Sequence, residues 1–173
     1  MASRTRKPKP RDDQIQALFI AAEYFEDRGE VYLAATCLKQ AAEHGHESSQ
    51  LNLGNYYSWG TGVSRDPKKA AYWYKRAYNN QSRGFRDSAA AVNLAIDLRA
   101  AGKTRQAVQW FERARALGDG SASLELAKHY LQHGARVRAA KLAREVLALD
   151  GSETSELERE EAAELLAKIA AKK

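Results

Sequence analysis

The sequence predicts an all-α protein made of helical hairpins stacked side by side. One skeleton of small and aromatic residues occurs four times along the 173 residues. Each copy has a small residue, an aromatic residue or Leu three places later, and then a Gly placed to end a helix. The runs between these positions are rich in Ala and lack period-two alternation, which excludes β-strands.

The spacing within each copy indicates two helices that pack closely. In three copies an Ala follows the first small residue by 12 places, and another small apolar residue lies seven places further on. Small residues let neighbouring helices approach, and seven places are two helical turns on one face. Since one hairpin cannot bury its apolar side alone, neighbouring hairpins must cover it. The four skeletons are Ala22, Phe25, Gly29, Ala34 and Ala41; Gly54, Tyr57, Gly60, Ala70 and Ala77; Ala95, Leu98, Gly102, Ala107 and Ala114; and Ala127, Tyr130, Gly134, Ala139 and Val146.

Local signals set the helix boundaries. Pro8 and Pro10 oppose a helix before residue 12. Asp66 followed by Pro67 is a strong helix start, because the carboxylate accepts hydrogen bonds from the first turn and Pro needs no donor there. The expected hairpin helices are 12–28 and 31–44, 48–59 and 67–79, 87–101 and 104–117, and 121–133 and 136–149.

A last helix is expected over residues 156–171. Ser155 and Glu158 form a capping box at its start. Its apolar residues form one stripe opposite a face rich in Glu, so we expect a solubilising cap over the fourth hairpin. The stripe comprises Leu157, Leu165, Leu166 and Ile169, with Ala162 alongside.

These motifs resemble two related repeat families. The first, third and fourth copies match the spacing of tetratricopeptide repeats. The second copy, with Leu53-Gly54-x-x-Tyr57-x-x-Gly60-x-Gly62-Val63 and then Asp66-x-x-Lys69-Ala70-x-x-Trp73-Tyr74-Lys75-Arg76-Ala77, resembles a SEL-one-like repeat. The first copy departs by having Cys37-Leu38 where an aromatic residue is usual. The predicted architecture is a right-handed superhelix of about four antiparallel hairpins plus a C-terminal capping helix.

Composition and charge divide the chain into three parts. Residues 1–11 carry five positive charges and no acid, and we expect a disordered basic tail; residues 12–150 form the repeat region and residues 151–173 the cap. Residues 12–64 sum to −6 and residues 65–105 to +7. A single Cys suits a reducing compartment, and no apolar run is long enough to span a membrane. We therefore expect a cytoplasmic protein.

No residue pattern predicts catalysis, a metal or a cofactor. His129 and His133 have a zinc-compatible spacing but lack a third ligand, and we expect them at a helix end where positive charge is favoured. Cys37 lies on the packing side of its helix and is expected to be buried and inert. No Gly-rich phosphate loop follows a strand. We therefore predict a protein that is not an enzyme.

The resemblance implies a concave groove lined by the first helix of each hairpin. Carried over by spacing, the groove has an acidic end, an aromatic centre and a basic far end, which would orient a bound peptide by charge. Trp59 is the expected anchor, since large aromatic residues dominate such contacts; the alternative is that it only covers the junction of the first two hairpins. The predicted groove residues are Phe19, Glu23, Glu26, Asp27, Asn55, Ser58, Trp59, Ile96, Arg99 and Lys128.

Two insertions around the second copy offer further contacts. Residues 60–66 lengthen its turn, and the extra residues that follow fall at 79–87. Surface loops of repeat proteins often carry function, so Arg83, Phe85 and Arg86 are candidate contacts. The alternative is that Val63 and Phe85 plug neighbouring hairpins.

These observations favour a protein–protein interaction module that serves as an adaptor, regulator or assembly factor and binds its partner through the concave face. One alternative is a cognate inhibitor, of the immunity type, that neutralises a toxin or effector. Another is a nucleic-acid-associated protein that uses the basic tail and residues 65–105.

Overall fold

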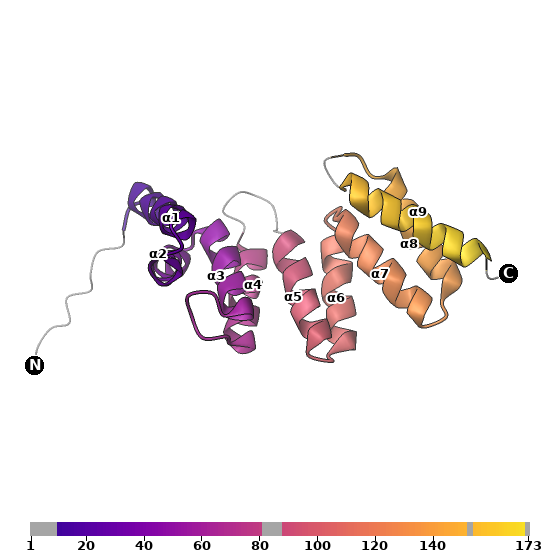
Figure 1. Ribbon diagram of the computed structural model, residues 1–173, viewed down its shortest axis with the longest axis horizontal. Coiled ribbons are helices and arrows are strands. Elements are labelled where there is room, and N and C mark those ends of the chain that lie inside the picture. The colour runs from indigo at the N-terminus through magenta and orange to yellow at the C-terminus, as the bar shows by residue number, and fades with distance from the viewer. Residues whose placement is uncertain (1–9, 81–87, 152–153, 172–173) are drawn as a thin grey trace, which may run out of the picture. The chain divides into compact units, whose positions relative to one another are not determined.

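The computed structural model describes residues 10–80, 88–151 and 154–171, and the secondary structure in these ranges is entirely helical (Figure 1). The all-α prediction is confirmed, and every expected helix begins and ends within two residues of its observed bounds. The helices are α1 (Asp12–Asp27), α2 (Val31–Glu43), α3 (Glu47–Trp59), α4 (Pro67–Asn79), α5 (Ser88–Ala100), α6 (Thr104–Arg115), α7 (Gly120–Gln132), α8 (Arg136–Ala148) and α9 (Glu156–Ala171).

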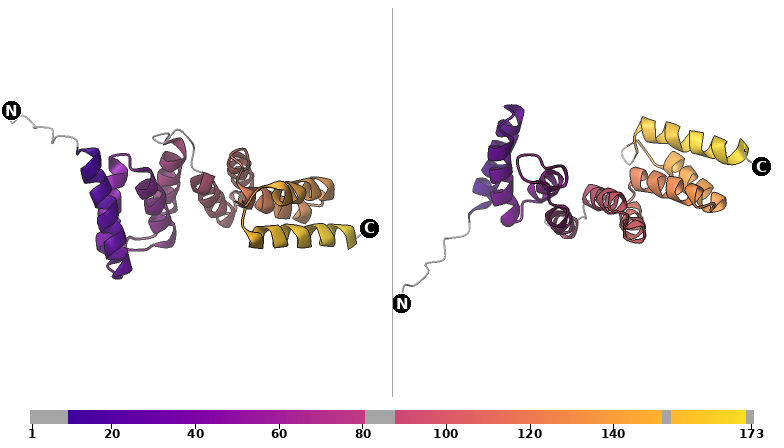
Figure 2. Two further views of the ribbon diagram at one scale, coloured as in Figure 1. Left: turned by 90° about the horizontal axis from the view of Figure 1, so that it is seen from above. Right: turned by 60° about the horizontal axis from the view of Figure 1, so that its bottom comes forward.

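The chain divides into two compact units. The first unit, Met1–Arg83, contains α1 to α4, and the second unit, Gly84–Lys173, contains α5 to α9. Within each unit, successive helices pack as hairpins, α1 with α2, α3 with α4, α5 with α6 and α7 with α8. In the second unit α9 packs along α8 and also contacts α7 (Figure 2).

The repeated small residues are buried where helices pack together, as the spacing predicts. In the first unit, Ala22, Ala34 and Gly54 are all buried. A methyl group at Gly54 would lie 2.5 Å from the ring of Tyr74, so only Gly allows α3 and α4 to approach this closely. The core between the two hairpins is Ala22, Ala34, Ala35, Leu38, Ala42, Leu53, Tyr56 and Trp73.

The predicted helix ends are also confirmed. Gly29, Gly60, Gly102 and Gly134 follow the first helices of the four hairpins with φ of 73°, 81°, 72° and 77°, a left-handed conformation that Gly adopts without strain. Asp66 accepts hydrogen bonds from the backbone N–H groups of the first turn of α4, at 3.0 and 3.1 Å.

The inserted loop after α3 packs against the first hairpin. Gly62 approaches the carbonyl of Val31 so closely that a Cβ would lie 2.1 Å from the oxygen. Val63 is half-buried against the core between the hairpins. This part of the insertion therefore has a packing role, which was the alternative considered for Val63.

The capping helix α9 begins at the predicted capping box. The backbone N–H of Ser155 donates to Glu158 Oε2 at 2.8 Å, and the N–H of Glu158 donates to Ser155 Oγ at 3.3 Å. Ala162 and Leu165 are buried on this helix, but Leu157 is 64% exposed, so its place in the predicted stripe is wrong. Leu157 precedes Leu165 by eight places, about 80° further round the helix, which turns it away from α7 and α8.

Candidate functional site

The candidate site in the first unit is built on the first helices of its two hairpins, α1 and α3. Together these helices carry six acidic residues and no Lys or Arg. Glu23, Glu26 and Asp27 are exposed on the last turns of α1. The negative charge expected at this end of the groove is therefore open to solvent.

Phe19 packs between α1 and the start of α3, against the core of the first unit. Its half-buried ring lies 4.7 Å from the ring of His46, centroid to centroid. His46 is itself fixed, because its Nε2 lies 3.2 Å from the side-chain oxygen of Gln16 and its Nδ1 accepts a hydrogen bond from the N–H of Ser49. Phe19 thus contributes a positioned apolar base, with limited area for a partner.

Asn55 and Ser58 are held in place by neighbouring residues. The hydroxyl of Tyr74 donates to Asn55 Oδ1 at 2.9 Å. The Ser58 side chain is buried, and its backbone carbonyl accepts a hydrogen bond from Arg65 Nε at 3.0 Å. These contacts fix the last turn of α3, which carries Trp59.

Trp59 is the most exposed aromatic side chain of this surface, at 73%. It is the last residue of α3 and precedes Gly60, where the chain turns left-handed. A side chain this open covers little of the junction between the hairpins. Its indole presents a large apolar area to solvent at the end of a helix.

Glu26 lies close enough to α3 to raise the pKa of Tyr56 on that helix. The Tyr56 side chain is buried, one turn before Trp59. Burial first, and then the negative charge of Glu26 beside it, raise the pKa of Tyr56 to about 12. The acidic end of the surface therefore reaches the last turns of α3.

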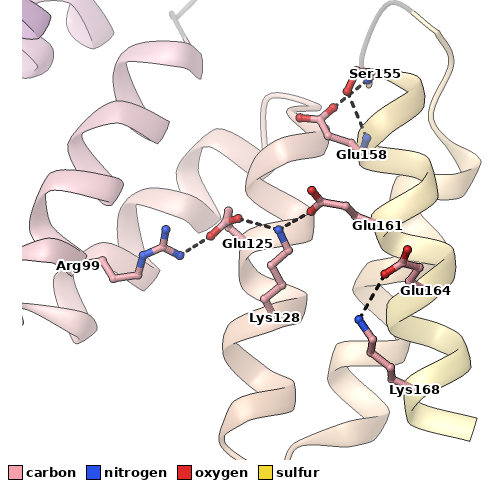
Figure 3. A network of polar contacts seen from close by, with 8 residues as sticks. All are labelled: Arg99, Glu125, Lys128, Ser155, Glu158, Glu161, Glu164 and Lys168. Carbon is pink, nitrogen blue, oxygen red and sulfur yellow. Dashed lines mark hydrogen bonds and ion pairs between the residues drawn. The ribbon is translucent and has the colours of Figure 1, made fainter. Parts of the chain in front are cut away.

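In the second unit the predicted cations belong to an ion-pair network (Figure 3). Arg99 of α5 pairs with Glu125 of α7. Lys128 pairs with Glu125 at 3.2 Å and with Glu161 of α9 at 2.5 Å. Hydrogen bonds and ion pairs outweigh the opposing effect of burial, so the pKa of Glu125 is lowered and that of Lys128 is raised.

Ile96 is the apolar residue among the candidates predicted in the second unit. Ile96 lies on α5 with 41% of its surface exposed, in the same helix as Arg99. The charges of Arg99 and Lys128 are balanced by two carboxylates within the unit. The loop candidates Arg83, Phe85 and Arg86 lie outside the described residues.

His129, His133 and Cys37 are the residues whose type suggested a metal ligand or a nucleophile, and their contacts fit a role in packing. His133 Nδ1 lies 2.8 Å from the carbonyl of His129, at the end of α7. Burial, followed by the positive charges of His133 and Arg99, lowers the pKa of His129.

Cys37 is half-buried, whereas the sequence predicted that it would be buried. Burial raises the pKa of its thiol and so disfavours the reactive thiolate. Within residues 10–80, 88–151 and 154–171, His, Cys, Asp and Glu side chains do not gather in threes suited to a metal ion.

Sequence reasoning missed an apolar surface on the first hairpin. Ile20 and Tyr24 on α1 are each 56% exposed. Tyr56 occupies the place of Tyr24 one repeat later, 32 residues on, and is buried against the first hairpin. Aligning the copies by this offset would have identified Tyr24, because the same register is a packing position in the next repeat.

The chain was compared with known protein families. The model described as Sel1 repeat matches residues 31–46, 47–82 and 88–119. These segments correspond to α2, to the hairpin α3–α4 and to the hairpin α5–α6. Repeats of this family are generally protein–protein interaction scaffolds and typically lack catalytic activity.

Solved structures share the fold at low identity. A Sel1 repeat protein from Oxalobacter formigenes is 23% identical with a TM-score of 0.67, over 79% of this chain and 59% of that one. The protein c5321, a protective antigen of uropathogenic Escherichia coli, is 22% identical with a TM-score of 0.64, over 92% of this chain and 39% of that one. The structure of MamA is 16% identical with a TM-score of 0.62, and the match covers 93% of this chain and 88% of that one.

The chain thus spans less than two thirds of the length of the first two of these structures. A search of the curated proteins found no match. Across the part of the chain that the structure describes, every helix is too short or too polar to cross a bilayer.

Proposed function

Because the chain is a Sel1-like repeat protein of helical hairpins, we propose that it is a non-enzymatic module that binds another protein through the first helices of its hairpins. In the first unit the binding surface is formed by α1 and α3, with Trp59 as the anchor. A cytoplasmic location, expected from the single cysteine, is part of this proposal.

The observation that carries the proposal is the exposure of Trp59 on a fixed helix end. Large apolar side chains on a folded surface favour burial in a partner, and Trp is enriched among residues that dominate binding energy. The backbone of its turn is held by the hydrogen bond from Arg65 to Ser58. Little conformational entropy of the backbone is therefore lost on binding.

The charge of the surface defines the class of partner. Since α1 and α3 contain only acidic charged residues, we propose a partner segment that presents an apolar side chain to Trp59 beside Lys or Arg residues. In the second unit, considered by itself, Ile96 is a proposed apolar contact, and Arg99 and Lys128 would contribute only by exchanging their present carboxylate partners. The loop residues Arg83, Phe85 and Arg86 remain proposed contacts.

Affinity capture with matched variants tests this proposal. Trp59→Ala, alone and combined with Glu26→Arg, should lose the partner captured by the wild-type protein from an extract of its source cells. Tyr32→Ala is the control, because Tyr32 is 72% exposed but lies on α2, the second helix of its hairpin. Equal recovery with all variants would remove α1 and α3 as the binding surface. The identity of the captured protein would distinguish an adaptor, regulator or assembly factor from an inhibitor of a toxin or effector.

A further inference from the structure

The charges of the second unit are divided unevenly between the first and second helices of its hairpins. The first helices, α5 and α7, hold two acidic and two basic residues, which balance. The second helices, α6 and α8, hold two acidic and seven basic residues, a net charge of +5. The basic residues are Arg105, Arg113, Arg115, Arg136, Arg138, Lys141 and Arg144.

Three of these seven cations are engaged within the unit. Arg115 pairs with Glu145 at 2.9 Å and with Glu112 at 3.2 Å. Arg138 pairs with Glu112 at 3.2 Å and stacks over the ring of Tyr130 at 4.0 Å. Arg136 donates a hydrogen bond to a backbone carbonyl of α9. Glu112 and Glu145, the two acidic residues of α6 and α8, are thus already paired with Arg115 or Arg138.

The other four cations are exposed: Arg105, Arg113, Lys141 and Arg144. None of them forms an ion pair with another residue in the described ranges. The guanidinium of Arg113 lies over the ring of Trp110, at 4.3 Å from its centroid, which holds it at the surface. Their charges are therefore available to a ligand.

Helical spacing places these cations on one surface. Arg105 and Arg113, eight places apart, flank Gln109 on the outward stripe of α6, while Lys141 and Arg144 share the outward stripe of α8. The ion pairs from Arg115 to Glu145 and from Arg138 to Glu112 join the facing edges of α6 and α8. We call this surface the α6–α8 face.

We propose that the α6–α8 face binds the phosphate backbone of a nucleic acid without reading its sequence. Exposed cations that form no ion pair suit a polyphosphate, because each contact releases a condensed counterion. Lys is also depleted from protein–protein interfaces. The pI of about 9.4 agrees with the charge expected of a nucleic-acid-binding chain.

This inference is independent of the protein-binding surface and of the N-terminal basic segment. The α6–α8 face lies in the second unit and on second helices, whereas Trp59 lies on α3 in the first unit. It also differs from the tail and residues 65–105 considered from the sequence, since only Arg105 is shared between the two sets. Failure of one site would therefore leave the other untouched.

The test is fluorescence anisotropy of a labelled 20-nucleotide oligo-dT strand at several salt concentrations. If the four free cations contact phosphates, log K should fall with log salt at a slope of about −2.8, at roughly 0.7 per contact. Lys141→Gln combined with Arg144→Gln should reduce the slope to about −1.4, which corresponds to about 25-fold weaker binding at about 0.1 M salt. Gln is a good helix former, so α8 should be retained.

A matched control separates this face from net charge alone. Lys39→Gln combined with Lys168→Gln removes two exposed cations from α2 and α9 and should leave the slope and affinity unchanged. Deletion of residues 1–11 should leave the contribution of Lys141 and Arg144 intact. Equal losses in both double variants would overturn the proposal. So would binding to vesicles of phosphatidylserine and phosphatidylcholine without binding to oligo-dT, or a salt slope that Lys141 and Arg144 do not affect.

Discussion

At the scale of single residues, the packing of the second hairpin depends on Gly54. A Cβ at this position would overlap the ring of Tyr74, which is almost fully buried and hydrogen-bonded to Asn55. Ala is favoured over Gly in a helix by about 1 kcal/mol, but overpacking of a close contact costs about 1–3 kcal/mol. The clash therefore outweighs the gain in helix propensity.

We predict that Gly54→Ala lowers the free energy of unfolding by about 1 kcal/mol, measured by urea denaturation. Gly151→Ala is the control, because nothing lies within 4 Å of a Cβ built there. A Gly54→Ala protein as stable as the wild type would show that the ring of Tyr74 moves aside without loss.

Tyr56 gives the protein a predicted loss of stability at alkaline pH. Its folded-state pKa of about 12 lies above the ordinary value of 10 given for Tyr. A raised folded pKa means that the fold favours the protonated hydroxyl. The stabilisation is therefore complete below pH 10 and is lost as the pH rises from about 10 to about 12, by on the order of 2 kcal/mol.

Glu26→Gln should lower the pKa of Tyr56 and shrink this loss, because the neighbouring negative charge is removed. Spectrophotometric titration of tyrosinate, together with urea denaturation between pH 9 and about 12, measures both effects. Tyr56→Phe identifies the signal of this residue. An unchanged Tyr56 titration in Glu26→Gln would contradict the proximity of Glu26 to the hydroxyl.

At the scale of helices, Lys128 joins the capping helix to the fourth hairpin. It bridges Glu125 of its own helix α7 and Glu161 of α9. Lys168 also pairs with a Glu of α9, but that pair lies within one helix and both side chains are about 70% exposed. An exposed pair of this kind contributes about 0.3–0.5 kcal/mol, whereas removing Lys128 leaves two half-buried carboxylates near each other.

We therefore predict that Lys128→Met lowers the free energy of unfolding by about 1 kcal/mol, with the pair partly screened by solvent. Lys168→Met should change it by less than about 0.5 kcal/mol. Thermal and urea denaturation of the two variants provide the comparison. Equal effects would mean that the bridge to Glu161 does not hold α9 in place.

The sequence predicted the helices well because the signals that start and end them are local. The Gly residues after the first helices, the Asp66 cap and the Ser155–Glu158 capping box act within a few residues of the helix end. The position of Leu157 was predicted wrongly, because an apolar residue in a first helical turn has too few neighbours in sequence to fix its face. The sequence also left open whether Val63 packs against the first hairpin, because that packing depends on the close approach of the Gly62 backbone to α2.

At the scale of the whole molecule, the sequence did not predict how the charges of the candidate residues are used. Arg99 and Glu125 are 26 residues apart, and Lys128 and Glu161 are 33 apart. Pairs at such separations follow from packing between helices, which spacing within one repeat does not specify. The exposure of Trp59 likewise depends on the neighbouring hairpin and on the fixed turn after α3.

The two proposed surfaces differ in the class of partner that each would bind. The first helices of the first unit present acidic residues and an open aromatic side chain, which suits a protein partner. The second helices of the second unit present unpaired cations, which suits a polyanion. Under the two proposals, the same hairpin architecture would serve two separate types of binding.

The central claim, that a protein partner is bound through the first helices, is tested most directly by titration calorimetry of the captured partner with the purified protein. The account predicts that Trp59→Ala weakens binding by about 2 kcal/mol, roughly 30-fold in Kd, whereas Tyr32→Ala changes the Kd by less than about twofold. A partner that binds the Trp59→Ala protein as tightly as the wild type, and loses affinity for Tyr32→Ala, would contradict it.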